Sequence, residues 1–245
     1  MKAAVSCKLL LYADDSALLA SGESILEIEA ILSMELEAVS ESISEFNLFG
    51  SKRRLAKDKR LSIKCNGNEI ESGTEVTYLG LTLDQNLSGS SVASKIIKKS
   101  TNKLKFLYRT TRNLDRKTKS MLTSALIQCH FDYGCAIWYS GLTCAYKKKL
   151  QVVQNKIIKF ILDVPPRTHV GAPEFCSVHL LPVPLRVEQL KLNHMFNIMN
   201  GTSPEYLKCD ISVMGNDGHN TRSGHRACVV PSVKSFGLRT LFTLL

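Results

Sequence analysis

The chain has 245 residues, enough for one large domain or two small ones, and its 44% hydrophobic and 22% charged residues are typical of a folded protein. No stretch approaches 18 uninterrupted apolar residues, which argues against a membrane-spanning helix and a membrane partner. Eight scattered cysteines without a CxxC pair, and no signal peptide, predict an intracellular protein of the nucleus or the cytoplasm.

Charge is distributed unevenly along the sequence. Residues 1–50 contain 2 Lys/Arg and 9 Asp/Glu, whereas the rest of the chain contains 30 Lys/Arg and 13 Asp/Glu. An acidic beginning before a basic body fits an acid-bearing site joined to a surface for a polyanion. A basic protein without any nucleic-acid role is the alternative interpretation.

Two apolar runs, residues 8–13 and 16–20, flank the acidic pair Asp14 and Asp15. The turn chemistry between the runs predicts a β-hairpin with both carboxylates at or beside its tip. Two-metal catalysis needs acidic oxygens that converge on two divalent cations, and Mg²⁺ prefers carboxylate ligands. An exposed turn that binds nothing is the alternative.

After the hairpin, apolar residues at helical spacing predict a helix over 24–45 that packs against it. Residues 51–60 form a basic linker. A small antiparallel sheet is predicted over 61–83, with Asn66-Gly67 as a hairpin turn and 76–83 as a strand.

From about residue 88 the apolar pattern becomes helical. Further helices are predicted over 115–131, with Asp115 as the N-cap, over 145–162, ended by Pro165-Pro166, and over 184–200. Trp138 is expected to be a packing anchor. Little packed structure is expected over 209–245.

Between residues 92 and 160 there are 15 Lys/Arg and 2 Asp/Glu. Cations that lie along a nucleic-acid backbone release counterions, so binding by such helices is salt-sensitive. Solvated helix faces are the alternative. The predicted backbone contacts are Lys95, Lys98, Lys99, Lys103, Lys105, Arg109, Arg112, Lys147, Lys148 and Lys149.

Tyr12-Ala13-Asp14-Asp15 resembles the aromatic-x-Asp-Asp box of reverse transcriptases, in the Tyr-Ala-Asp-Asp form found in non-LTR (jockey-like, LINE-type) retrotransposons. Later motifs follow the order of the same family: Phe49-Gly50, a segment that resembles the family's hairpin beside the primer (Tyr78-Leu79-Gly80-Leu81-Thr82-Leu83-Asp84), Asp132-Tyr133-Gly134 with Trp138, Gln151–Lys156, Leu181-Pro182-Val183 with Arg186, Asn200-Gly201, and Pro204-Glu205-Tyr206-Leu207.

The resemblance implies an α+β fold with four parts: a partial reverse-transcriptase palm (1–86), a basic, helical thumb-like region (87–165), a C-terminal helical region (166–208) and a weakly ordered tail (209–245). It also implies RNA-directed DNA polymerase activity on an RNA template and a DNA primer. Asp14 and Asp15 would be the catalytic pair that binds Mg²⁺. Tyr12 and Ala13 would border the primer end or the incoming nucleotide, and Tyr78, Leu79 and Gly80 would form the primer grip.

The sequence also departs from this family. Residues 1–13 contain no Asp or Glu, so the third catalytic Asp is missing there, as are the fingers. A short palm segment with a lysine, expected between the predicted helix 24–45 and Phe49-Gly50, is missing as well. We therefore expect a truncated polymerase that is inactive alone and self-associates through its exposed palm face. The alternatives are a non-enzymatic nucleic-acid-binding protein that uses the basic helices, and a chain without a selected function.

Overall fold

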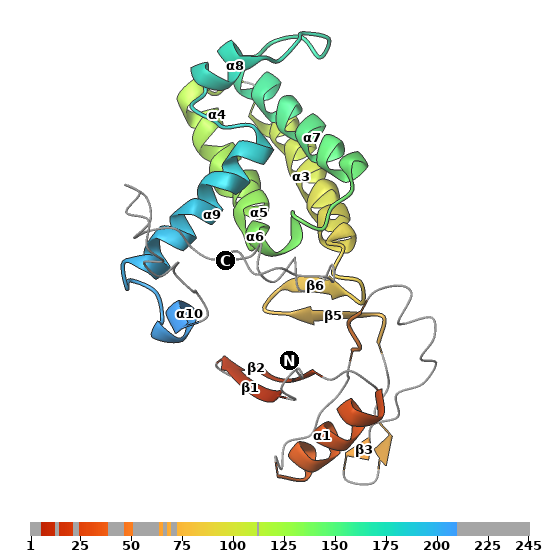
Figure 1. Cartoon of the computed structure of the whole chain (residues 1–245). Coiled ribbons are helices and arrows are strands. Elements are labelled where there is room, and N and C mark those ends of the chain that lie inside the picture. Colours follow the sequence, from red (N-terminus) through yellow and green to blue (C-terminus); the bar gives the residue numbers. More distant parts are fainter. Residues whose placement is uncertain are drawn as a thin grey trace. The chain divides into compact units, whose positions relative to one another are not determined.

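The computed structural model describes residues 6–12, 15–21, 25–38, 47–50, 64–65, 68–69, 73–111 and 113–209. These residues form a mixed α and β structure in which helices outweigh strands, in agreement with the predicted α+β class (Figure 1). The chain divides into two compact units, Met1–Leu87 and Ser88–Leu245. The described strands all belong to the first unit, and the described helices other than α1 belong to the second.

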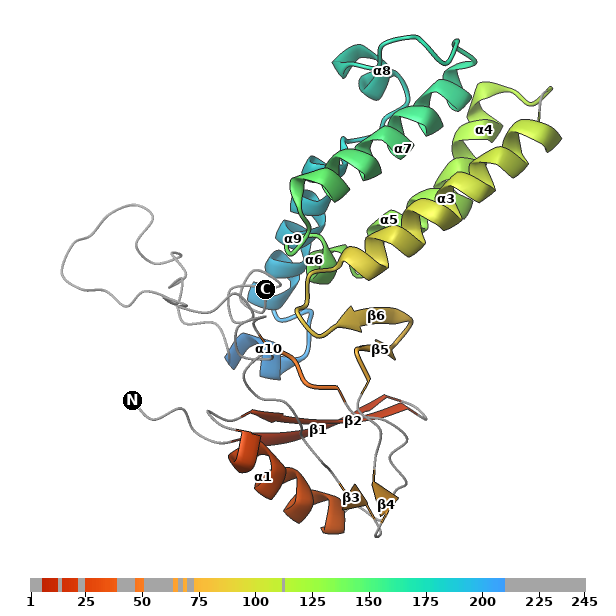
Figure 2. The ribbon, with the colours of Figure 1, turned by 90° about the vertical axis from the view of Figure 1, so that its right-hand side faces the viewer.

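The first unit begins with the predicted hairpin, which is confirmed. Strands β1 (Ser6–Tyr12) and β2 (Asp15–Ser21) pair antiparallel from Ser6↔Ser21 to Tyr12↔Asp15. Helix α1 (Ile25–Ala38) contacts both strands of this hairpin (Figure 2). The remainder of the helix predicted over 24–45 falls on residues 24 and 39–45, which lie outside the described residues.

Two further hairpins complete the first unit. Strands β3 (Lys64–Cys65) and β4 (Asn68–Glu69) pair so that Asn66-Gly67 connects them, as predicted. Strands β5 (Glu75–Tyr78) and β6 (Leu81–Asp84) form a separate two-stranded sheet. The prediction of one sheet, with 76–83 as a single strand, is therefore wrong, whereas the hairpin that the resemblance implies at Tyr78–Asp84 is present. The chain reverses at Leu79-Gly80, where φ is 47° and 76°, as a tight hairpin turn with two left-handed residues requires.

The second unit is helical. Its elements are α3 (Ser90–Thr110), α4 (Arg116–Thr123), the π-helical turn η1 (Ser124–Gln128), α5 (Cys129–Asp132), α6 (Cys135–Trp138), α7 (Cys144–Leu162), α8 (Ala172–Ser177), α9 (Val183–Met199) and α10 (Glu205–Cys209). The prediction of a helix over 115–131 is confirmed in position, although η1 interrupts it. The Asp115 carboxylate caps α4 by accepting from the backbone N–H groups of Lys117 and Thr118.

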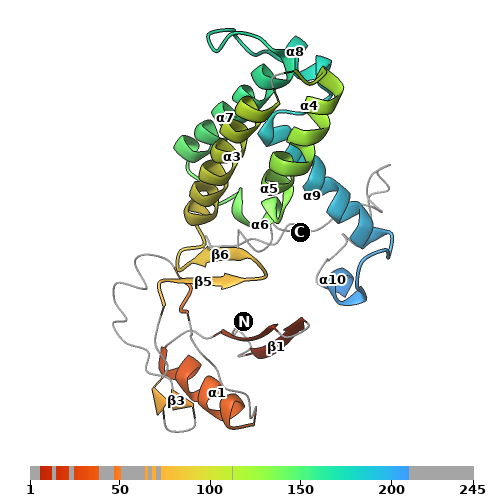
Figure 3. The same ribbon diagram turned by 180° about the vertical axis from the view of Figure 1, so that it is seen from behind.

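The core of the second unit lies between α3, α7 and α9. Helices α3 and α7 run side by side (Figures 1 and 2), and α9 packs against α5, α6 and α7 (Figure 3). Apolar side chains fill the space between them: Val92, Ile96, Leu104, Leu107, Leu150, Val153, Ile157, Ile161, Val187 and Ile198. Trp138 is 2% exposed, and its Nε1–H donates to the Tyr133 carbonyl, which confirms the predicted packing anchor.

One detail of the helical unit agrees with the sequence prediction and another differs. Helix α7 ends at Leu162, as predicted, with Asp163 in a left-handed conformation (φ 53°) before Pro165-Pro166. In α9, Leu185, Leu192 and Phe196 continue the apolar pattern but remain exposed. An apolar period thus locates the helix correctly without showing how much of its apolar face is covered.

Candidate nucleic-acid interface and acid-bearing hairpin

Strand register positions the acidic pair. Tyr12 and Asp15 pair across the end of the β1–β2 hairpin, and only Ala13 and Asp14 separate them in the sequence. Asp15 is thus the first residue of β2 and lies beside the hairpin tip, as predicted. Ala13 and Asp14 lie outside the described residues, as do the side chains of Tyr12 and Asp15. The Mg²⁺ site therefore stays a prediction.

The predicted primer grip lies at a second hairpin tip. Tyr78 ends β5, and Leu79 and Gly80 form the turn to β6. Behind the turn, the hydroxyls of Thr77 and Thr82 are 3.3 Å apart and join the two strands. Gly80 is exposed, so the turn presents backbone at the surface. Its contact with a primer stays a prediction.

Helix α3 carries most of the predicted backbone contacts. Between Ser90 and Thr110 it has six cations and no acid. Lys95, Lys98, Lys99, Lys105 and Arg109 are exposed, while Lys103 is half-buried. Lys103 Nζ lies 2.8 Å from Nε2 of His130 on α5. The predicted contact Arg112 lies outside the described residues.

Helix α7 adds five cations and no acid between Cys144 and Leu162. Lys147 lies over the ring of Tyr139 at 5.1 Å, and Lys149 lies over the ring of Tyr146 at 5.2 Å. Lys148 is exposed. Ring contacts hold a lysine in place yet leave its charge available, so the predicted cations on α7 are partly preorganised.

Direct contacts join α3 to α7. The rings of Tyr108 and Phe160 meet edge to face, with centroids 4.8 Å apart. Nearer the start of both helices, Ser94 Oγ donates to Tyr146 Oη at 3.2 Å. The two helices thus contact each other near both ends, and together they carry eleven cations and no acid, here called the cation array.

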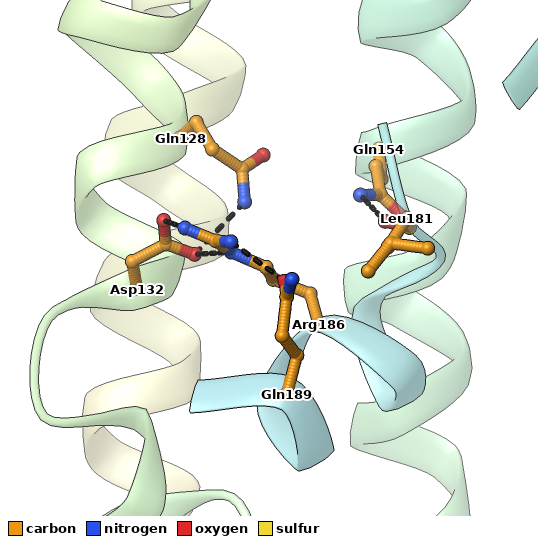
Figure 4. Close-up of polar contacts among 6 residues, drawn as sticks. All are labelled: Gln128, Asp132, Gln154, Leu181, Arg186 and Gln189. Carbon is orange, nitrogen blue, oxygen red and sulfur yellow. Dashed lines mark hydrogen bonds and ion pairs between the residues drawn. The ribbon is translucent and has the colours of Figure 1, made fainter. Parts of the chain in front are cut away.

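A polar network joins α5 to α9, and the sequence did not predict these contacts (Figure 4). Arg186 donates to both oxygens of Asp132, at 3.3 and 2.8 Å. Gln128 also donates to Asp132, and Arg186 donates to Gln189. The carboxylate beside Arg186 raises the pKa of its guanidinium. The motif order in the sequence contained Asp132 and Arg186, but no local pattern indicated that residues 54 positions apart would pair.

Gln154 joins α7 to the start of α9. Its side chain is buried, donates to the Leu181 carbonyl at 2.8 Å (Figure 4) and accepts from the Val183 N–H at 3.0 Å. Gln151 accepts from the same N–H. The motif residues Asp132, Gln151, Gln154 and Arg186 are therefore architectural in this structure, because they fix α9 to the helices that precede it.

A lysine and a serine meet between α6 and α9. Lys191 Nζ donates to Ser140 Oγ at 2.5 Å. Burial lowers the pKa of Lys191, and burial also raises the pKa of the nearby Cys135 thiol. Among the described residues, no group of three or more His, Cys, Asp or Glu side chains is arranged to hold a metal ion.

Comparisons with known proteins leave the family open. No protein-family model, curated protein or solved structure matches the chain. Within the described parts of the chain, no helix combines the length and apolar character needed to cross a membrane.

Proposed function

We propose that the chain is part of the palm and the thumb of a non-LTR retrotransposon reverse transcriptase. The observation that carries this proposal is the register of the β1–β2 hairpin, with Tyr12 paired to Asp15 and only Ala13 and Asp14 between them. Adjacent carboxylates beside a short connection between paired strands suit two Mg²⁺ ions, which prefer carboxylate ligands that converge on them. Asp14 and Asp15 are the proposed metal ligands.

The cation array of α3 and α7 supports the same proposal. Eleven positive charges without a negative one suit the backbone of an RNA template paired to a DNA primer. The proposed contacts are the predicted ones, and the exposed turn at Tyr78, Leu79 and Gly80 is the proposed primer grip. The proposed setting is intracellular, where both nucleic acids occur.

We further propose that the 245-residue chain does not polymerise DNA alone. One hairpin supplies two carboxylates, whereas the family to which the resemblance points uses a third from another strand. The segment between α1 and Phe49-Gly50 also lacks the lysine associated with the leaving pyrophosphate. Without these groups the developing charge on the phosphates is not neutralised.

Primer extension tests this proposal. The chain, a variant with Asp14→Asn and Asp15→Asn, and a buffer control are incubated with an RNA template, a DNA primer, the four deoxynucleotides and Mg²⁺. We expect no extension by the wild-type chain. Extension that the double variant abolishes would overturn the proposed inactivity while supporting the family; extension that survives in the double variant would contradict the role of the acidic pair.

A second function, non-enzymatic nucleic-acid binding, is favoured by the same array of cations without acids on α3 and α7. The two proposals differ in what Mg²⁺ does. If the hairpin binds Mg²⁺ near the primer end, the ion tightens binding of a primer–template, and the Asp14→Asn, Asp15→Asn variant loses this effect. A pure binding module binds equally with and without the acidic pair.

Self-association through an exposed palm face is part of the proposal. Sedimentation velocity over about a hundredfold range of concentration tests it. A sedimentation coefficient that rises with concentration supports association, and a constant monomer value at high concentration contradicts it.

A further inference from the structure

His130 lies between a π-helical turn and a row of lysines. The turn η1 directly precedes α5 and contains an additional residue per turn, which rotates the following positions by about 100° relative to a continuous α-helix. The direction of His130 toward α3 therefore depends on this turn. Helices α3 and α5 contact each other (Figure 2).

The contact defines the protonation state of the imidazole. Lys103 Nζ lies 2.8 Å from Nε2 of His130, and an ammonium group can only donate. Nε2 must therefore accept, which places the ring proton on Nδ1 and leaves the imidazole neutral. Lys99 precedes Lys103 by one helical turn and lies on the same side of α3.

The charged groups around His130 come from several elements. Helix α3 contributes Lys99 and Lys103, and η1 contains no ionisable side chain. On α5 itself the acid is Asp132, which is bound to Arg186 of α9. Among the described residues, neither Lys99 nor Lys103 forms an ion pair with a carboxylate. The cluster thus gathers positive charge without a counter-charge.

We propose that Lys99, Lys103 and His130 form a phosphate-binding subsite that takes up one proton when it is occupied. This inference rests on the proposed nucleic-acid contact of α3 and adds a pH dependence to it. A phosphodiester oxygen placed at the cluster attracts the Lys103 ammonium away from Nε2. The freed Nε2 then accepts a proton from solvent, and the imidazolium donates a charge-assisted hydrogen bond to the phosphate.

The direction of the pH effect follows from the electrostatics. In the free protein, burial and the charges of Lys103 and Lys99 lower the pKa of His130. A bound anion offsets those charges and raises the pKa again. Protons are therefore taken up on binding, and affinity increases as the pH falls through the interval between the two pKa values. One proton changes the dissociation constant by at most about tenfold per pH unit.

NMR titration of the His130 ring tests the subsite without nucleic acid. Sulfate is the probe, because its charge is constant over the pH range used. Saturating sulfate is expected to raise the pKa of His130 by about one unit in the wild-type chain. The Lys103→Met variant is expected to raise the pKa without sulfate, because the lowering charge is removed. His194, exposed on α9, is the internal control. A pKa of His130 that sulfate leaves unchanged overturns the inference.

Binding of a labelled 20-base-pair DNA duplex at pH 5.5 and 7.5 tests the coupling. We expect wild type and His194→Gln to bind roughly tenfold tighter at the lower pH, and His130→Gln to change less than about threefold. Gln keeps an acceptor for Lys103 but does not titrate. Equal pH ratios for wild type and His130→Gln overturn the inference even if DNA binds. Absence of DNA binding at both pH values counts against the proposed function, and the sulfate titration then decides the subsite alone.

Discussion

Replacing Asp163 by Asn tests how the second unit holds a buried charge. Lys119 on α4 is 2% exposed, and its Nζ lies 2.5 and 2.6 Å from the two oxygens of Asp163 at the end of α7. The ammonium also lies 5.5 Å from the centre of the Phe160 ring. Asn tolerates the left-handed conformation of residue 163, so the substitution removes the charge and leaves the backbone in place.

The expected loss follows from the unequal burial of the two partners. Breaking a fully buried pair costs about 3–5 kcal/mol, because one charge remains uncompensated. The side chain of Asp163 is 67% exposed, so water replaces part of its interaction with Lys119. We therefore expect Asp163→Asn to lower the free energy of unfolding by roughly 2 kcal/mol. Lys119→Met removes the buried charge itself and is expected to cost about 1 kcal/mol or less.

Denaturant unfolding followed by tryptophan fluorescence measures both variants. Trp138 is the only tryptophan and is buried in the second unit, so its emission reports this unit. A cost below about 0.5 kcal/mol for Asp163→Asn would refute the reasoning. A larger loss for Lys119→Met than for Asp163→Asn would refute it as well, because the lysine would then contribute mainly by packing.

Further predictions concern one backbone position and one helix cap. A Cβ at Gly89 would lie 2.2 Å from the Trp138 carbonyl oxygen, whereas one at Gly201 would meet nothing within 4 Å, and both residues have positive φ. In thermal unfolding, Gly201→Ala should lower the free energy of unfolding by about 1–2 kcal/mol, and Gly89→Ala should lower it distinctly more. Equal losses in the two variants would contradict the clash at Gly89. Hydrogen bonds from Thr118 lower the pKa of Asp115 below 3.8. The Asp115 carboxylate therefore stabilises the folded state above that pH. This stabilisation is lost as the pH falls through the lower pKa of Asp115 in the folded state. Between about pH 5 and 3, the melting temperature of Asp115→Asn should fall less than that of wild type. An identical fall would refute the stabilising role of the Asp115 carboxylate.

Local sequence signals predicted the elements that depend on neighbouring residues. The apolar period located α3, α7 and α9 to within a few residues, and Asp115 marked the start of α4. Asn66-Gly67 located a hairpin, because this dipeptide is one of the few that favour a two-residue connection between paired strands. These features depend on residues within one or two turns of each other, so a short stretch of sequence is enough to predict them.

Features that depend on distant residues were not predictable. No local pattern indicated the ion pair between Asp163 and Lys119, which are 44 positions apart. The π-helical turn η1 has no sequence marker. The acidic pair and the cation-rich helices of the candidate site were visible in the sequence, but the pairing of Lys103 with His130 was not.

The most direct test of the account is the salt dependence of binding to a labelled 20-base-pair RNA–DNA hybrid. A variant that loses three exposed cations of α3 (Lys98→Gln, Lys105→Gln, Arg109→Gln) is compared with a charge-matched control (Lys117→Gln, Arg167→Gln, Lys208→Gln) outside α3 and α7. The wild-type chain should bind with a dissociation constant of about 1–100 μM near physiological salt. The slope of log affinity against log salt should become shallower by about 3 in the α3 variant and remain unchanged in the control. Equal slopes in the two variants, or binding that does not depend on salt, would contradict the proposed nucleic-acid interface.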